Sequence, residues 1–187
     1  MFYKKKPTIA VFCGSQKGNK TIYSSQSKKV ARILCKNSYP IIYGGGRTGL
    51  MGTISDTIKK SKGKIIGIFP DFLNIQKLAQ EGLYKFYTVK TLSNRKKIMI
   101  NRSDAFLILP DGFGTLDELL EVLTLKQLGL SNKPIIIFNI HGFWNPLKKF
   151  FLFMKKEGFV NHKDIKHIFW AKNADEILNF LDNNFHK

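Results

Sequence analysis

The sequence predicts an α/β protein built on a doubly wound parallel sheet with helices on both faces. Short apolar runs rich in β-branched residues recur along the chain, and helix-length segments with apolar residues at three- and four-residue spacing lie between most of them. Alternating strands and helices are typical of a parallel sheet, because each crossover helix must pack on one of its faces. With 187 residues and 43% hydrophobic content, we expect one domain covering residues 1–187.

Six strands are predicted, each bounded by Gly, Pro, Ser or Asn, at residues 8–13, 40–43, 64–69, 84–89, 105–109 and 134–138. Helices are predicted at residues 23–36, 50–61, 94–102 and 115–128, and at 143–156 and 174–181 after the last strand. This order corresponds to a Rossmann-like fold. In such sheets ligands bind beyond the carboxyl ends of the strands, so the loops after the strands are the first places to search for a site.

The predicted helix 115–128 is more apolar than contact with one sheet face requires. Seven aliphatic side chains, Leu116, Leu119, Leu120, Val122, Leu123, Leu125 and Leu128, spread around most of its circumference. We expect a homodimer contact on this helix, since broad apolar faces mark interfaces. The alternative is a helix buried on two sides within the monomer.

Composition excludes several classes of function. The net charge of +18 comes from scattered lysines with only four arginines among 31 basic residues, a pattern of lysine-rich codon usage; we expect weak nonspecific adhesion to nucleic acid and no specific recognition. No apolar run reaches the ~20 residues of a membrane span. Cys13 and Cys35 lack metal or redox spacing, which favours reduced thiols in a cytoplasmic protein. The four histidines show no metal spacing, and no cofactor is expected.

The loop after the fifth predicted strand has the features of a phosphate site. Gly112 and Gly114 would let the backbone approach a ligand closely, and the helix that follows presents its positive end to an anion. Thr115 adds a hydroxyl and Glu118 a carboxylate. The alternative is a helix capping box, in which Thr115 and Glu118 satisfy backbone donors and carry no chemistry.

Two further strand-end loops and one basic segment accompany this loop. Residues 44–52 fit G-x-G-x-x-G after the second strand, although no acidic residue stands where a dinucleotide fold requires one, and a tight turn remains the alternative reading. Ser15 lies in a similar loop after the first strand. Arg95 and Lys96 begin a helix near the expected anion site, where Arg95 could grip a phosphate; a solvated basic turn is the alternative.

Taken together and in order, these motifs resemble the LOG ("Lonely guy") family of cytokinin riboside 5′-monophosphate phosphoribohydrolases, once labelled lysine decarboxylases. The resemblance rests on Cys13-Gly14-Ser15, Gly44-Gly45-Gly46 with Gly49-Leu50-Met51-Gly52, Arg95-Lys96, Ser103 to Phe106, and Pro110 to Glu118 with Lys126 to Gly129. It covers nearly the whole chain.

The resemblance implies a Rossmann-like homodimer that hydrolyses the N-glycosidic bond of a purine nucleoside 5′-monophosphate, AMP or an N6-prenylated form, to free base and ribose 5-phosphate. It implies that Arg95 and Glu118 are catalytic. Phosphate and substrate would be bound by Gly112, Gly114 and Thr115, with Ser15, Gly45, Gly46 and Lys96. A non-catalytic nucleotide- or molybdenum-cofactor-binding protein of the same fold is the alternative.

The sequence departs from the family pattern at Asp111, where the hallmark PGGxGTxxE has glycine. A carboxylate in a phosphate cradle adds a like charge. An inward Asp111 would weaken or reassign the site, whereas an outward one would let activity survive with altered affinity. Leu92-Ser93-Asn94 also replaces residues that many relatives share, which leaves the choice between plain and prenylated adenine open.

Overall fold

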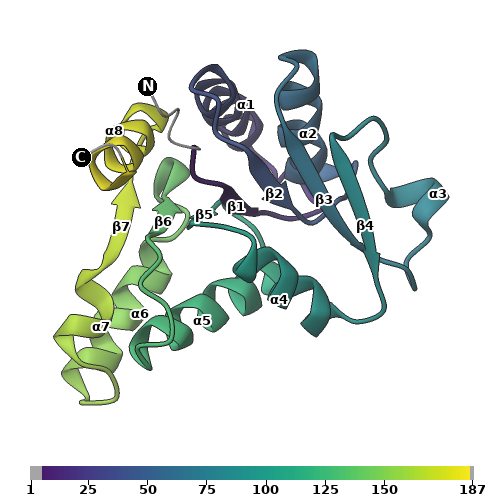
Figure 1. Cartoon of the computed structure of the whole chain (residues 1–187). Coiled ribbons are helices and arrows are strands. Elements are labelled where there is room, and N and C mark those ends of the chain that lie inside the picture. The colour runs from purple at the N-terminus through teal and green to yellow at the C-terminus, as the bar shows by residue number, and fades with distance from the viewer. Residues whose placement is uncertain (1–5, 186–187) are drawn as a thin grey trace, which may run out of the picture.

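The computed structural model describes residues 6–185, and its sheet confirms the predicted fold class (Figure 1). The strands are β1 (Ile9–Phe12), β2 (Ile41–Tyr43), β3 (Ile65–Pro70), β4 (Lys85–Val89), β5 (Ala105–Ile108), β6 (Ile135–Phe138) and β7 (Ile168–Ala171). They form one seven-stranded sheet in the order β4-β3-β2-β1-β5-β6-β7, and every neighbouring pair is parallel. The order reverses at β1, as it does in a doubly wound sheet.

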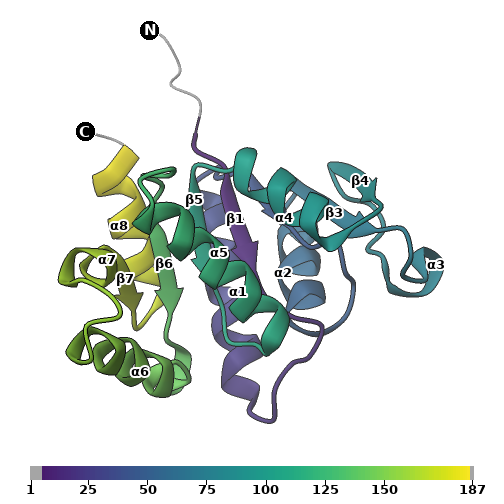
Figure 2. The ribbon, with the colours of Figure 1, turned by 90° about the horizontal axis from the view of Figure 1, so that it is seen from below.

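The helices cover both faces of this sheet. They are α1 (Thr21–Lys36), α2 (Gly49–Lys60), α3 (Ile75–Leu78), α4 (Leu92–Asn101), α5 (Phe113–Gln127), α6 (Asn145–Lys156), α7 (His162–Lys166) and α8 (Ala174–Phe185), with the 3-10 turn η1 (Ile140–Gly142). Figure 1 shows α1, α2 and α8 on one face and α4, α5 and α6 on the other, and Figure 2 shows α4 and α5 in front of the sheet. Between residues 6 and 185, no helix is long and apolar enough to cross a membrane.

Two hydrophobic cores hold these layers together. The central strands β1, β5 and β6 are buried along their whole length, so they read as continuous apolar runs and not as alternating ones. On the α4–α5 side, the rings of Phe12 and Phe106 stack with centroids 5.8 Å apart. Full burial of such a ring contributes about 1.5–3 kcal/mol. The strong burial of β1 and β5 fixes the positions of the loops that follow them.

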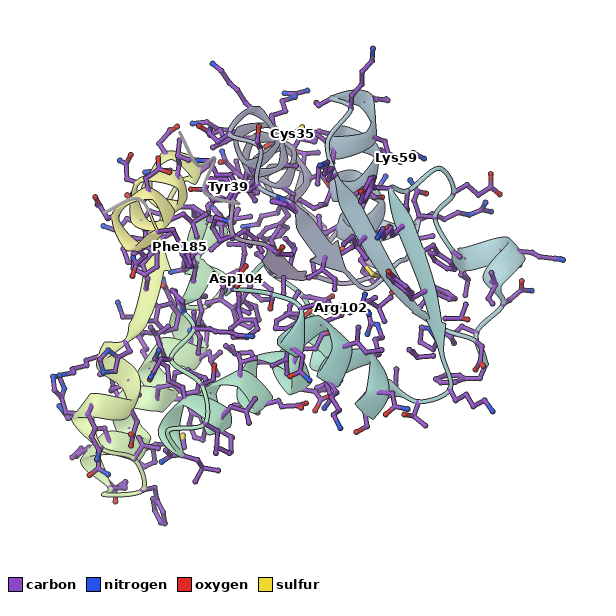
Figure 3. All side chains as sticks on the ribbon, in the orientation of Figure 1. Cys35, Tyr39, Lys59, Arg102, Asp104 and Phe185 are labelled. Atoms are coloured by element: carbon purple, nitrogen blue, oxygen red, sulfur yellow. The ribbon has the colours of Figure 1, made fainter. Side chains whose placement is uncertain are left out.

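Side-chain contacts tie the start of β1 to the segment before β5. The Asp104 carboxylate accepts a hydrogen bond from the backbone N–H of Thr8 at 2.7 Å, and Asp104 is labelled in Figure 3. Arg102, at the end of α4, lies over the ring of Tyr87 on β4, 4.7 Å from its centroid. Both contacts hold the chain just after α4, about two turns of helix from Arg95.

The structure corrects the predicted elements in two ways. Strand β7 and the short helices α3 and α7 were not expected, because each has only four or five residues, too few for a period to show. Helices α1, α4 and α5 also begin two residues earlier than predicted, at Thr21, Leu92 and Phe113. The six predicted strands are all present.

The apolar side chains of α5 are of three kinds: buried, partly buried and exposed. Leu119 and Val122 are buried against the sheet, and Leu116, Leu123 and Leu125 pack partly buried on the same core. Three more apolar side chains on α5 or at its end are largely exposed in the monomer, with exposed fractions of 91% for Phe113, 49% for Leu120 and 65% for Leu128. The monomer therefore covers only part of the apolar surface of α5.

Candidate active site

The switch in strand order gathers the three predicted loops at one edge of the sheet. The loop after β1 packs on the start of α2, where the backbone N–H of Met51 donates to Gly14 O at 3.1 Å and that of Leu50 donates to Gln16 O at 3.2 Å. The end of β5 is tied to β1 by a hydrogen bond from the Leu109 N–H to Phe12 O at 3.0 Å. The loops after β1, β2 and β5 therefore form one continuous rim, as expected for a ligand site in this fold.

Arg95 and Glu118 meet at this rim although they come from different helices. Arg95 Nη1 lies 3.3 Å from Glu118 Oε1, and the two side chains are 16% and 6% exposed. Arg95 Nε also donates to the backbone oxygen of Ile68 on β3 at 3.1 Å, which fixes the direction of the guanidinium. Thr91 caps α4 by accepting a hydrogen bond from the Asn94 N–H at 3.1 Å. The site therefore combines a guanidinium held in one direction, that of Arg95, with the buried carboxylate of Glu118.

The protonation of Glu118 is set by its surroundings. Burial raises the pKa of Glu118 from about 4.5 to about 7; the Arg95 guanidinium opposes this rise, and the Asp111 carboxylate adds to it. A carboxyl group with this pKa exchanges its proton near neutral pH. Proton transfer at physiological pH requires such a group, and clefts with perturbed pKa values are typical of catalytic sites.

Asp111 points into the site. Its Oδ2 accepts a hydrogen bond from Thr115 Oγ1 at 2.9 Å, and its carboxylate fills the space that a side chain at Gly14 would need. Its negative charge also raises the pKa of both Glu118 and Cys13. The question that the sequence left open is therefore answered: the carboxylate at position 111 lies within the rim, against the loop after β1.

The capping-box interpretation of Thr115 and Glu118 is wrong. Helix α5 begins at Phe113 with Gly112 as its N-cap, and no side chain caps it. Thr115 therefore lies inside the first turn, where its hydroxyl donates to Asp111, and Glu118 lies deeper and pairs with Arg95. Neither side chain serves the helix end, so both are available to the site.

The glycines of the rim fall into two groups. A Cβ atom at Gly112 or Gly114 would meet no protein atom within 4 Å, so nothing in this chain requires glycine there. Gly45, by contrast, has a φ of +78°, a conformation that favours glycine, and a Cβ at Gly46 would press on the Met51 side chain. Packing within the chain explains Gly45 and Gly46, whereas the open space at Gly112 and Gly114 fits the close approach of a ligand.

The structure does not bring Lys96 to the rim. Its ammonium forms ion pairs with Asp117 and Glu121 on α5, each at 2.8 Å, and this pair of contacts fastens α4 to α5. Ser15 is exposed, in the loop that packs on the start of α2. Of the predicted binding residues, Gly112, Gly114 and Thr115 thus lie at the start of the helix that carries Glu118, while Lys96 is engaged with Asp117 and Glu121.

Three residues of the site have positions or roles that the sequence alone did not reveal. The Ile68 carbonyl that holds Arg95 belongs to an ordinary strand residue, and no sequence signal marks it. The Arg95 guanidinium occupies the space that a side chain at Gly44 would fill. The run of glycines indicated a need for small residues there but not that Arg95 takes up the space. Cys13 is buried beside the carboxylates, and burial, together with the charges of Glu118 and Asp111, holds the pKa of its thiol well above the usual range. Burial and a raised pKa both keep the thiol protonated, the form in which it is a poor nucleophile.

Metal ligands do not gather at this rim. Across residues 6–185, no three His, Cys, Asp or Glu side chains are grouped as a metal site would require.

Comparison with known proteins places the site in a family context. The family model described as "Possible lysine decarboxylase" matches residues 51–181. The cytokinin riboside 5′-monophosphate phosphoribohydrolase LOG2 of Arabidopsis thaliana is 39% identical over 174 residues, 93% of this chain and 82% of that protein, and LOG1 of the same plant is 37% identical with the same coverage. A molybdenum cofactor binding protein from Rippkaea orientalis superposes with a TM-score of 0.74 over 96% of this chain and 98% of its own, at 19% identity, a likeness of fold alone.

Proposed function

The chain belongs to the LOG family, and we propose that it hydrolyses the N-glycosidic bond of a purine nucleoside 5′-monophosphate, releasing the free base and ribose 5-phosphate. The observation that carries this proposal is the Arg95–Glu118 pair, 3.3 Å apart, beside a glycine cradle at the switch point of the sheet. The curated relatives that span more than nine tenths of the chain are named as phosphoribohydrolases of a nucleoside monophosphate. AMP and N6-isopentenyl-AMP are the two substrates to test.

Glu118 is the residue we assign to the reacting sugar. Cleavage of an N-glycosidic bond passes through a sugar with oxocarbenium character, and an ionised carboxylate beside it stabilises the developing positive charge. The same carboxylate can take a proton from the attacking water, because its pKa of about 7 matches the working pH. Water then adds to the anomeric carbon as the bond to the base breaks and its electron pair leaves with the base. Glu118 takes one proton from that water and later returns it to solvent, and the departing base takes a proton from solvent, so that the neutral base is released.

Arg95 and the cradle supply position and counter-charge. The guanidinium is held by Ile68 O and Glu118, so its remaining N–H donors are directed at the rim, where the ribose phosphate would lie. Gly112 and Gly114 offer backbone approach at the start of α5, whose helix dipole favours an anion. Holding the phosphate fixes the anomeric carbon relative to Glu118, which turns binding energy into correct orientation.

The activity is tested directly by chromatography of the reaction products. Incubation with AMP or N6-isopentenyl-AMP should release adenine or its prenylated form together with an equal amount of ribose 5-phosphate. The ratio of kcat/KM for the two substrates identifies the preferred base. Absence of both products with both substrates contradicts the proposed hydrolase and favours a protein that binds nucleotides without cleaving them.

Asp111→Asn and Asp111→Gly are expected to lower the KM for AMP about tenfold, since each removes a negative charge that repels the substrate phosphate. The Asp111 charge also raises the pKa of Glu118, so both variants should move the acidic limb of the pH–activity profile to lower pH. Steady-state kinetics between pH 5 and 9 measure both effects.

Asp117→Asn is the matched control, because Asp117 is exposed and its carboxylate pairs with Lys96 outside the rim. Its KM should equal that of the natural chain. A rise in KM for Asp111→Asn would overturn the repulsion argument and make Asp111 a residue that binds the substrate.

Gly114→Ala separates a ligand cradle from a simple helix start. The added methyl group meets no protein atom, and alanine favours the helix over glycine by roughly 0.5–1 kcal/mol, so the melting temperature should stay level or rise by about 2–4 °C. If phosphate approaches the backbone here, the KM for AMP should rise about tenfold, a loss of ~1.4 kcal/mol of binding. Thermal melting and initial-rate kinetics on the same preparation test both halves, and an unchanged KM would remove Gly114 from the cradle.

We further propose a homodimer formed through α5, acting as a single-domain enzyme in the cytoplasm. The exposed side chains of Phe113, Leu120 and Leu128 support this assembly, since contiguous apolar surface on a helix marks an interface. Phe113 lies between the two cradle glycines, so a partner that covers it would also close the rim. Both cysteines are free, in keeping with a reducing compartment.

A further inference from the structure

A cleft of about 600 Å³ lies along α1 and α2, and two of its lining side chains, Lys17 and Arg47, come from the loops after β1 and β2 that also border the candidate active site. Figure 1 shows these two helices side by side on one face of the sheet, whereas α4 and α5, which carry Arg95 and Glu118, lie on the opposite face. Neither Arg95 nor Glu118 lines the cleft. Its volume is within the range of pockets that bind small molecules.

Basic side chains dominate the lining of this cleft. Five cations line it, namely Lys17, Lys28, Arg32, Arg47 and Lys60, against the single carboxylate of Asp56, a net charge of +4. The Asp56 carboxylate is already engaged, because it accepts a hydrogen bond from the Gln80 amide at 2.6 Å. The cleft is therefore electropositive, and the one carboxylate in its lining is hydrogen-bonded to Gln80.

None of the five cations has a partner within residues 6–185: no ion pair or side-chain hydrogen bond engages them. Two lysines outside the cleft do pair with acids, Lys29 with Asp175 at 2.7 Å and Lys96 with Asp117 at 2.8 Å. Like charges that converge on one hollow repel one another. An anion of several charges would relieve that repulsion at every one of these side chains.

The cations follow the length of the cleft. Lys28 and Arg32 are one turn apart on α1, about 6 Å along the axis, and Lys60 lies in the last turn of α2. Lys17 and Arg47 come from the loops that precede the two helices. The charges are therefore spread along a line and not focused on one point, which suits a chain of phosphates better than a single phosphate or carboxylate.

The rest of the lining excludes a base-stacking role. The other residues of the cleft are small or hydroxyl-bearing: Ser24, Thr48, Gly49, Gly52, Thr53, Thr57 and Ser61. No aromatic side chain is among these lining residues, all of which the structure describes, so the cleft has no platform on which nucleobases could stack. The first amides of α2 are also occupied, since those of Leu50 and Met51 donate to the loop after β1. Recognition would thus rest on the cationic side chains.

From these observations we propose that the α1–α2 cleft is a second ligand site, which binds the oligophosphate chain of a small anion such as tripolyphosphate or a nucleoside triphosphate. The site is separate from the proposed hydrolase centre, and its occupation does not depend on that reaction. The phosphates lie along Lys28, Arg32 and Lys60, and Lys17 and Arg47 close one end.

Calorimetric titration of the full chain with inorganic tripolyphosphate at physiological salt tests the site. Ribose 5-phosphate in excess keeps the catalytic cradle filled. The double variant Lys28→Ala/Arg32→Ala should weaken tripolyphosphate binding at least tenfold. The matched control Lys163→Ala/Lys166→Ala removes the same charge from α7 and should change the dissociation constant less than twofold.

Each other outcome overturns the proposal. Equal weakening in both double variants would mean attraction by the overall charge of +18 and not by the cleft. Displacement of tripolyphosphate by ribose 5-phosphate would place it in the catalytic cradle. Tighter, cleft-dependent binding of a single-stranded RNA oligomer would make nucleic acid the occupant.

Titration with ATP distinguishes the two sources of the phosphate chain. Equal affinity of ATP and tripolyphosphate shows that the cleft recognises the phosphates alone.

Discussion

Glu118→Gln is expected to lower kcat for base release by about 10²–10⁴-fold at pH 8, the range found when a general base or charge-stabilising carboxylate is removed. Glutamine keeps the shape of the side chain and can still contact Arg95, but it carries no negative charge for the sugar cation and takes no proton from water. Because the substitution leaves the cradle intact, the KM for AMP should change little. Release of adenine followed by chromatography measures both constants.

The natural chain should show the titration of the same group. Glu118 acts as the carboxylate, and burial raises its pKa in the free chain to about 7, so kcat/KM should fall as the pH drops through about 7 and level off above about 8. Glu118→Gln should have no such limb. Glu121→Gln, one turn further along α5 and paired with Lys96, is the control and should retain the natural rate and profile. Full activity in Glu118→Gln would transfer the catalytic role to another residue.

The general architecture of this protein follows from sequence patterns that are strong. Six runs bounded by turn residues predicted six strands correctly, because the inner strands are buried on both faces and read as apolar runs, and the exposed edge strand β4 contains β-favouring residues. Strand β7 has only four residues, two of them partly exposed, and it depends on β6 for its hydrogen bonds. A strand of this kind is stabilised by its neighbour, so its own residues carry little evidence of it.

The candidate site was predictable where local chemistry alone determines it. The glycines at 112 and 114, and the acid at 118, mark their loop through residue type and spacing. The pairing of Arg95 with Glu118 joins residues on two helices that only the tertiary fold brings together, and here the family resemblance supplied what spacing could not. The capping-box reading failed because it placed the helix start at Thr115, and the actual start at Phe113 changes the role of every residue in the first turn.

The direction of the Asp111 side chain shows why such details need coordinates. Thr115 is four residues further along the chain and holds the Asp111 carboxylate inward, and Gly14 leaves the space that this carboxylate fills. Each of these three residues is compatible with other arrangements when read alone. Their combination suggests a site in which an internal carboxylate contacts the same hydroxyl that a phosphate would use.

Arg95→Ala is expected to lower kcat/KM for AMP by about 10²–10³-fold at pH 7, because it removes the positioned cation of the site. It has a second, separate effect. The Arg95 guanidinium holds the pKa of Glu118 down, so without it the pKa should rise above 7 and less of the active carboxylate remain at neutral pH. The acidic limb of the profile should therefore move to higher pH, and part of the lost activity should return at pH 9.

Arg95→Lys and Arg102→Ala distinguish this mechanism from a general loss of structure. Lysine keeps the positive charge, so the limb should stay near that of the natural chain, yet it lacks the planar fork that contacts both Ile68 O and Glu118, and kcat/KM should still fall. Arg102 lies just after the same helix, over Tyr87. Its replacement by alanine should leave kcat/KM and the pH of the acidic limb unchanged. A profile for Arg95→Ala that is lower at every pH but unshifted would show that Arg95 binds substrate without tuning Glu118.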